Sequence, residues 1–159
     1  MTRTDRRRLL LGVASAPLLA RPALALSPAL PLELWKARGC SCCAAWARHM
    51  EEAGFHVTTH EVDDVDPHRA AAGVPAALTG CHTARTAGGL VVEGHVPAGA
   101  VLRLLAERPP GVVGLAVPGM PVGSPGMEVE GRPGDPYDVL AFARDGSWRV
   151  VEAVRPAKP

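Results

Sequence analysis

The chain has 159 residues, enough for one domain that buries a hydrophobic core without help from disulfides. Hydrophobic residues make up 47% and charged residues 21%, an ordinary globular balance, while 17 Gly and 16 Pro indicate many turns. Removing residues 1–25 takes away five arginines and one aspartate, which leaves 12 basic and 15 acidic side chains and a net charge of −3. That charge argues against nucleic acid or an anionic membrane surface as a partner of the mature protein.

The first 25 residues have the layout of an export signal. Arginines precede an apolar run from Leu9 to Ala20, and the small residues Ala23 and Ala25 suit cleavage after Ala25. The run is shorter than the roughly 20 apolar residues that span a bilayer. The Arg-Arg-Arg-Leu-Leu segment at 6–10 resembles a twin-arginine signal. We therefore expect an exported protein with no membrane segment in its mature form.

Hydrophobic patterning and turn residues predict seven secondary-structure elements between residues 32 and 109. They are, in order, a strand at 32–37, a helix at 42–54, a strand at 55–64, a short helix at 66–72, two strands within 81–96 joined at Gly88-Gly89, and a helix at 97–109. This β-α-β-α-β-β-α order is typical of the thioredoxin and glutaredoxin fold, in which a redox motif lies between the first strand and the first helix.

The chain changes character beyond residue 110. A loop rich in Gly and Pro is expected at 114–128, and a hairpin at 135–153 that turns at Asp145-Gly146. The prediction is an α/β, thioredoxin-like core with a C-terminal extension. We expect the export signal at 1–25, the thioredoxin-like domain at 26–110, and a loop and β-hairpin extension at 111–159 that packs on the same domain.

Three of the four cysteines stand together in Cys40-Ser41-Cys42-Cys43, at the junction between the first predicted strand and the first predicted helix. The positive end of the helix dipole lowers thiol pKa values there and favours thiolates, which are nucleophiles and soft-metal ligands. In an oxidising compartment a structural disulfide is the alternative. A bond within four residues closes almost no loop and stabilises little, so the cluster favours metal binding or redox chemistry.

The fourth cysteine, Cys81, is expected to complete the cluster. Centring the hairpin on Gly88-Gly89 pairs Ala87 with Leu90, which places His82 roughly opposite His95 and Cys81 at the start of its strand. In a thioredoxin-like sheet that position lies beside the first helix, so all four sulfurs would meet. The alternative is that Pro75 is a cis-proline at this position and that Cys81 lies farther along the strand, away from the site.

Four thiolates suit zinc, an iron–sulfur centre or Cu(I). The contiguous C-x-C-C lacks the separated pairs of zinc knuckles and is crowded for one tetrahedral ion, so sulfurs that bridge several metal ions fit it better. Met120 and Met127 lie in the Gly/Pro-rich loop, and thioethers suit Cu(I). For each methionine, covering a hydrophobic patch is the alternative.

The histidines divide into two groups. His82 and His95 are candidate ligands or proton-handling groups, because the expected hairpin brings them near Cys81. The others fall at positions that predict a solvent-exposed surface: His49, His56, His60 and His68.

Several segments together resemble the CopG-type copper-resistance proteins, periplasmic metal-binding proteins of Gram-negative bacteria. The segments are CSCCAAWARHMEEAGF, GVPAALTGCHTA, VEGHVPA, LLAERP, GLAVPGMPVGSPGMEV and DPYDVLAF. The resemblance runs from about Leu32 to Val151. It implies a thioredoxin-like fold with a C-terminal extension, a cluster of several copper ions bridged by cysteine sulfur, and a role in interconverting Cu(I) and Cu(II). The matching motif positions are Cys40, Cys42, Cys43, Cys81, Met120 and Met127.

The leading hypothesis is a periplasmic copper-binding protein that acts in copper resistance. Its partners would be copper ions, held as a Cu(I) cluster, and other periplasmic copper-resistance proteins. Two alternatives stay open: a thiol–disulfide oxidoreductase that uses Cys40 and Cys43, and a store or chaperone that leaves the copper oxidation state unchanged. The sequence does not decide whether the protein is an enzyme, such as a copper oxidoreductase.

Overall fold

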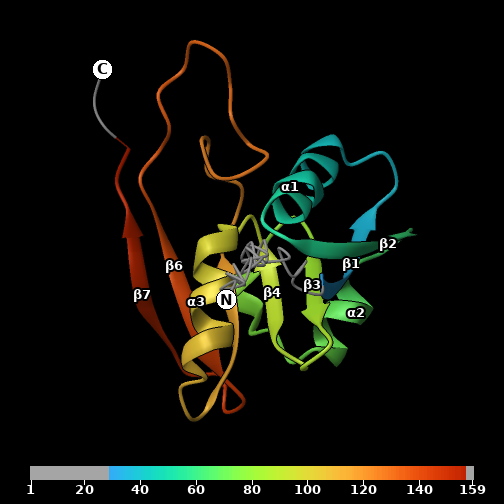
Figure 1. Cartoon of the computed structure of the whole chain (residues 1–159), viewed down its shortest axis with the longest axis vertical. Helices are drawn as coiled ribbons and strands as arrows, with labels where there is room; N and C mark the ends of the chain where they lie inside the picture. The colour runs from blue at the N-terminus through green and yellow to red at the C-terminus, as the bar shows by residue number, and fades with distance from the viewer. Residues whose placement is uncertain (1–28, 157–159) are drawn as a thin grey trace, which may run out of the picture.

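A seven-stranded mixed sheet forms the centre of the protein, in the order β2-β1-β3-β4-β5-β6-β7 (Figure 1). The computed structural model describes residues 29–156, so the expected export signal lies outside the described residues. The elements are β1 (Leu30–Ala37), α1 (Ser41–Glu52), β2 (Phe55–Val62), α2 (Asp66–Ala71), the 3-10 helix η1 (Ala76–Leu78), β3 (Thr83–Thr86), β4 (Val91–Gly94), α3 (Ala98–Glu107), β5 (Val112–Val117), β6 (Tyr137–Ala143) and β7 (Trp148–Val154). Strands β1 and β2 pair in parallel, as do β4 and β5, and the other neighbours are antiparallel.

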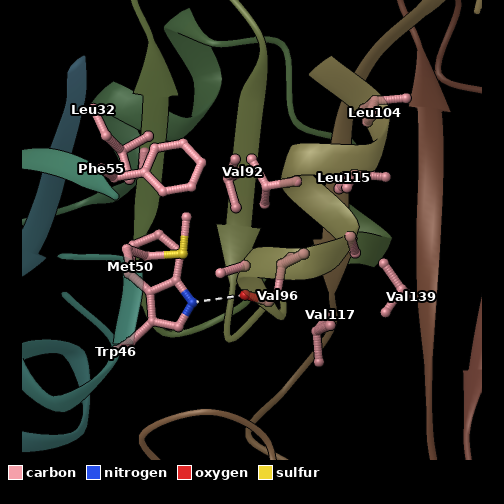
Figure 2. Packing of buried hydrophobic residues seen from close by; sticks show 14 of the residues in the cluster. Leu32, Trp46, Met50, Phe55, Val92, Val96, Leu104, Leu115, Val117 and Val139 are labelled. Carbon is pink, nitrogen blue, oxygen red and sulfur yellow. Dashed lines mark hydrogen bonds between the residues drawn. The ribbon is translucent and has the colours of Figure 1, made fainter. Parts of the chain in front are cut away.

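Helices cover the sheet on both faces. On one face, α1 and α3 pack over the main hydrophobic cluster, which includes Trp46, Val92 and Leu115 (Figure 2). Trp46 is fully buried there and donates its indole N–H to the Val96 carbonyl at 2.9 Å. The segment around α2 and η1 covers a smaller cluster on the other face, centred on Phe142. The site described below lies where α1 meets the end of β1.

Local sequence explains where the two longer helices begin and end. The Cys40 sulfur accepts a hydrogen bond from the Cys43 N–H and caps α1, and Gly54 follows the helix with φ +96°. Pro97 precedes α3 with φ −61°, which suits a helix start, and Arg108 ends α3 in the left-handed region. These boundaries agree with the predicted helices to within a few residues.

The α/β prediction is confirmed, and the expected element order is found through α3. The expected loop at 114–128 is wrong in its first part, because residues 114–117 belong to β5, which pairs in parallel with β4. The glycine and prolines of this segment favoured the prediction of a loop. Residues 114–117 form a strand because pairing with two neighbouring strands and burial between them outweigh a weak local strand propensity.

The predicted register of the β3–β4 hairpin is wrong by one residue. Thr83 lies opposite Glu93, and the Gly94 N–H donates to the His82 carbonyl, so His82 does not face His95 across the ladder. The Thr86 N–H bonds the Leu90 carbonyl, which leaves three residues in the turn instead of two. A three-residue turn is the next common hairpin loop, and the Gly-Gly pair suits both.

The residues beyond α3 extend the same sheet. Strands β5, β6 and β7 add to its edge next to β4. The long loop that joins β5 to β6, residues 118–136, rises at the top of Figure 1 and folds back toward α1. This loop therefore reaches the helix that carries the cysteine motif. Among residues 29–156, no helix combines the length and the apolar character that crossing a membrane requires.

Candidate metal centre

The C-x-C-C motif lies at the junction of β1 and α1. Gly39 has φ +69°, and the Cys40 N–H bonds back to the Ala37 carbonyl, which turns the chain from the strand into the helix. Cys40 and Cys43 are joined by a disulfide with a Cα–Cα distance of 5.4 Å, and Cys42 keeps a free thiol. Cys43 is fully buried, whereas Cys40 and Cys42 are partly exposed. Two of the three motif cysteines are therefore partly accessible to solvent.

Cys81 faces this motif, as predicted. Its sulfur lies 3.3 Å from the Cys43 sulfur, 3.5 Å from that of Cys40 and 3.7 Å from that of Cys42. The alternative with Pro75 is wrong: Pro75 precedes η1, and no cis peptide bond occurs among residues 29–156. Four sulfurs from two segments about 40 residues apart in sequence thus converge, with all four sulfur atoms within 4.8 Å of one another.

The environment of Cys81 favours its protonated form. Burial, together with the neighbouring Cys42 thiol, raises the pKa of Cys81 to about 11, although the charge of Arg69 opposes this shift. At neutral pH the Cys81 thiol therefore keeps its proton until a cation displaces it.

His82 and His95 lie beside Cys81 and are both buried. The ligand atoms of these three residues lie within 4.8 Å of one another, and the His82 ring also packs against the Trp46 ring at 4.3 Å. His95 Nδ1 bonds the Pro125 carbonyl at 2.9 Å, which leaves its Nε2 without a partner among the described residues. Neither ring nitrogen of His82 has a partner there. Buried nitrogens without partners are costly, and a metal ion or an ordered water would satisfy them.

Burial also sets the charge of these two imidazoles. It lowers the pKa of His82 well below the usual value and lowers the pKa of His95 as well, and the neighbouring His95 adds to the shift of His82. Both rings are therefore neutral at neutral pH, the form that binds metals. The prediction that they lie near Cys81 holds, although the register that suggested it was wrong.

The loop 118–136 brings the two motif methionines toward the site. Gly119 bridges to Gly80, the residue before Cys81, and Met120 follows it with 57% of its surface exposed. A Cβ on Gly126 would lie 2.7 Å from the Cys42 carbonyl oxygen, so the residue before Met127 packs directly on the first turn of α1. These contacts place the backbone near the cysteines. Ligation by the methionine sulfurs stays a prediction.

Three residues near the site were missed or misjudged from sequence. His49, expected at the surface, accepts a hydrogen bond from the Ala98 N–H at 3.0 Å and so caps α3. Arg69 and Glu93 form a buried ion pair next to Gly80. The sequence did hold a signal for Glu93, because a lone acidic residue in the apolar run VVEGHV is unusual unless it is paired.

Comparisons with known proteins agree with this geometry. Two solved structures, "Copper resistance protein copG- Form 2" and "Copper resistance protein copG- Form 1", are each 40% identical to this chain. The first aligns with 80% of this chain and 99% of its own length at a TM-score of 0.74, and the second with 79% and 98% at 0.73. A family described as "Protein of unknown function, DUF411" matches residues 78–127, and no curated protein matches the chain. The resemblance found in the sequence is confirmed: this chain belongs to the CopG family of copper resistance proteins.

Proposed function

We propose that this protein binds copper in the periplasm and acts in copper resistance, holding several copper ions between cysteine sulfurs. The observation that carries the proposal is the convergence of Cys40, Cys42, Cys43 and Cys81, in which four sulfur pairs lie 3.3–3.7 Å apart and all four sulfurs lie within 4.8 Å of one another. The names of the two similar structures add support, since both are copper resistance proteins. Copper is the cargo in this proposal.

The donor set suits Cu(I). Thiolate sulfur is soft and matches Cu(I) better than hard cations, and neighbouring thiolates can share metal ions. Because Cys40 and Cys43 are joined, full loading first requires two electrons and two protons to reduce the disulfide to two thiols. Binding then releases the thiol protons, including the proton that Cys81 retains at neutral pH.

Further donors are available around the sulfurs. His82 and His95 offer neutral nitrogens, and Met120 and Met127 in the loop 118–136 would add thioethers if the loop closes over the copper. Nitrogen donors bind Cu(II) better than thioethers do, so a mixed set would accommodate both oxidation states. This supports a role in interconverting Cu(I) and Cu(II).

The cysteine thiols can supply the electrons that interconversion of Cu(II) and Cu(I) requires. Oxidation of the Cys40 and Cys43 thiols to their disulfide releases two electrons and two protons, and the two electrons reduce two Cu(II) ions to Cu(I). An external dithiol must then reduce the disulfide, with two electrons and two protons, before all four sulfurs can hold Cu(I). In the reverse step, two Cu(I) ions give up one electron each and become Cu(II), and these two electrons with two protons convert the disulfide into two thiols. In this scheme the protein is a copper oxidoreductase, and other periplasmic copper-resistance proteins deliver or remove the ions.

The fold assignment belongs to the same proposal. We assign residues 26–110 to a thioredoxin-like domain and residues 111–159 to an extension, after an export signal at 1–25. Support comes from the β-α-β-α-β-β-α order and from the position of the motif between β1 and α1. The extension adds β5, β6 and β7 to one sheet edge and supplies the methionine loop.

A thiol–disulfide oxidoreductase is the second candidate, and the Cys40–Cys43 disulfide at the start of α1 favours it. Cys40 is the more exposed of the pair and would be attacked by an incoming thiolate. This candidate predicts insulin reduction that persists without metal, and it leaves Cys42 and Cys81 without a role. A copper store or chaperone differs from the main proposal in one respect: loaded copper would keep its oxidation state.

The test is anaerobic titration of the reduced mature protein with Cu(I), followed by elemental analysis of copper per chain. We expect several ions per chain in the wild type and a large loss in Cys42→Ser, because Cys42 has no role except as a bridging ligand. Ser41→Ala is the matched control, since Ser41 is exposed in the same turn and carries no sulfur. Near-normal copper in Cys42→Ser contradicts the bridging cluster, and one ion or none in the wild type, with insulin reduction intact, favours the second candidate.

A further inference from the structure

A buried ion pair lies next to Gly80, the residue before Cys81, on the face of the sheet that α2 covers. Arg69 comes from α2 and Glu93 from β4, and their exposed fractions are 8% and 0%. Arg69 Nε donates to Glu93 Oε1 at 2.7 Å. Asp66, one turn earlier on α2, also accepts from Arg69 and fixes the guanidinium from the solvent side.

Both members of this pair bind the backbone of the residue before Cys81. Glu93 Oε1 accepts the Gly80 N–H at 2.8 Å, and Arg69 Nη2 donates to the Gly80 carbonyl at 3.0 Å. The two polar groups of Gly80 are thus held by two side chains that also hold each other. Cys81 follows at once, so its Cα is tied to α2 and β4 through a single residue.

The neighbouring backbones leave Gly80 little room to move. A Cβ at this position would lie 2.6 Å from the Gly94 Cα and 3.3 Å from the Val117 carbonyl oxygen, which shows how closely three backbones cross here. The Gly119 N–H bonds the Thr79 carbonyl on the other side of Gly80. The backbone crossing limits how far Gly80 can shift, and the ion pair selects its orientation within that space.

A gain in folding stability is a poor explanation of the ion pair, because burying charges is costly. Removing two charges from water costs several kcal/mol per ion, and apolar residues of similar volume are often as stable or more so. A charged pair is better suited to fixing geometry, because the guanidinium offers donors in a rigid fork and the carboxylate accepts from two directions. Among the described residues, the pair makes the one side-chain hydrogen-bonded link between α2 and the segment carrying Cys81.

We propose that Arg69 and Glu93 are positioning residues that hold the Cys81 sulfur against the C-x-C-C motif through Gly80. The inference rests on the proposed function only for the identity of the bound ion. The positioning itself is a property of the protein without metal, and it can be measured as the effective concentration of one thiol toward another.

The measurement uses a full mature chain with Cys40→Ser and Cys42→Ser, which leaves only the thiols of Cys43 and Cys81, whose sulfurs lie 3.3 Å apart in the native chain. Serine at position 40 retains a capping oxygen for α1. In a glutathione buffer, two protein thiols and one glutathione disulfide give one protein disulfide and two glutathione thiols. The equilibrium ratio gives the effective concentration of Cys81 toward Cys43.

Two variants disrupt the bonds that Arg69 and Glu93 make to Gly80, here called the clamp, in different ways. Arg69→Met with Glu93→Met replaces the ion pair by apolar groups of similar size and frees both polar groups of Gly80. Arg69→Lys keeps the charge opposite Glu93 but lacks the fork that reaches Glu93 and the Gly80 carbonyl together. We expect both to lower the effective concentration about tenfold, since small misplacements of reacting groups have effects of this order or larger.

Arg103→Met is the control, because Arg103 pairs with Glu152 between α3 and β7 and has no bond to Gly80. It is expected to leave the effective concentration within about twofold. Urea unfolding establishes that each variant is folded, and if the double variant does not fold, Arg69→Lys decides. A folded Arg69→Lys protein with the wild-type effective concentration overturns the proposal.

Copper titration of the same clamp variants with all four cysteines restored separates the two ideas. We expect fewer copper ions per chain in Arg69→Lys than in Arg103→Met. If the wild type binds no copper while the thiol equilibrium responds as expected, the proposed function fails and the positioning role stands. If the wild type binds several copper ions and the thiol equilibrium does not respond, the positioning role fails alone.

Discussion

Replacing Gly126 by alanine should detach the loop 118–136 from α1. Gly126 has φ +83°, a region that costs a residue with a Cβ about 1–2 kcal/mol. Its Cβ would also lie 2.7 Å from both the Cys42 carbonyl oxygen and the Trp46 nitrogen, and both are helix backbone atoms that cannot rotate away. Overpacking of this kind costs about 1–3 kcal/mol.

The two effects together disfavour the docked loop by about 2–5 kcal/mol, which is about 30-fold to several thousand-fold in its population. The His95–Pro125 hydrogen bond, which anchors the same loop, should be lost with it. Hydrogen exchange of the amides at 124–128 measures the docking directly, and copper loading of the same variant reports whether Met127 takes part in binding.

Gly131→Ala is the matched control. Gly131 lies in the same loop with φ +73°, but a Cβ there meets no atom within 4 Å. It therefore carries the backbone strain without the clash, and its amides at 124–128 should exchange more slowly than those of Gly126→Ala. Equal exchange in Gly126→Ala and Gly131→Ala would refute the argument that contact with α1 holds the loop.

Three further predictions concern the scaffold around the site. Trp46→Phe removes the donor to the buried Val96 carbonyl and should lower the free energy of unfolding by about 1–3 kcal/mol, measured by urea denaturation. Gly114→Ala places a Cβ 2.3 Å from the Phe142 ring and should destabilise the protein by about 1–3 kcal/mol, seen as a lower urea midpoint. Burial holds the pKa of His82 below its unfolded value near 6.5, so the unfolded state binds the proton first as pH falls. The metal-free protein should keep this stability above about pH 6.5 and lose up to about 1.4 kcal/mol per pH unit below it, a slope that His82→Gln should reduce.

Each of these has a simple control. Trp148→Phe changes an indole that is 52% exposed and should leave the urea midpoint unchanged. Gly99→Ala adds a Cβ in open space on α3 and should be neutral or slightly stabilising. A pH slope that persists in His82→Gln would assign the proton uptake to another group.

The position of the cysteine motif and the order of the elements through α3 follow from local sequence. Periodicity, the capping position at Cys40 and the glycine after α1 act over a few residues, so they can be recognised without knowledge of the fold. The prediction that Cys81 lies beside the motif succeeded because β3 pairs with β1. The start of β3 must then lie near the end of β1, where the motif begins.

The predictions that were wrong concern features that depend on contacts between segments distant in sequence. Strand β5 is set by its parallel pairing with β4 and by burial between two strands, neither of which leaves a periodic local pattern. The hairpin register differs by one residue because a Gly-Gly pair fits a turn of two or of three residues, and the pairing with β1 decides between them.

Sequence alone determined the chemistry of this protein: soft sulfur donors concentrated at a helix start, in a motif that indicates the CopG family. Only the tertiary structure decided how those donors are held. It buried His82 and His95 as neutral rings, folded the methionine loop onto α1, and joined Arg69 to Glu93 across 24 positions of the chain. Each of these follows from side chains or backbones brought together by the sheet, and the energy of such contacts exists only once distant segments meet.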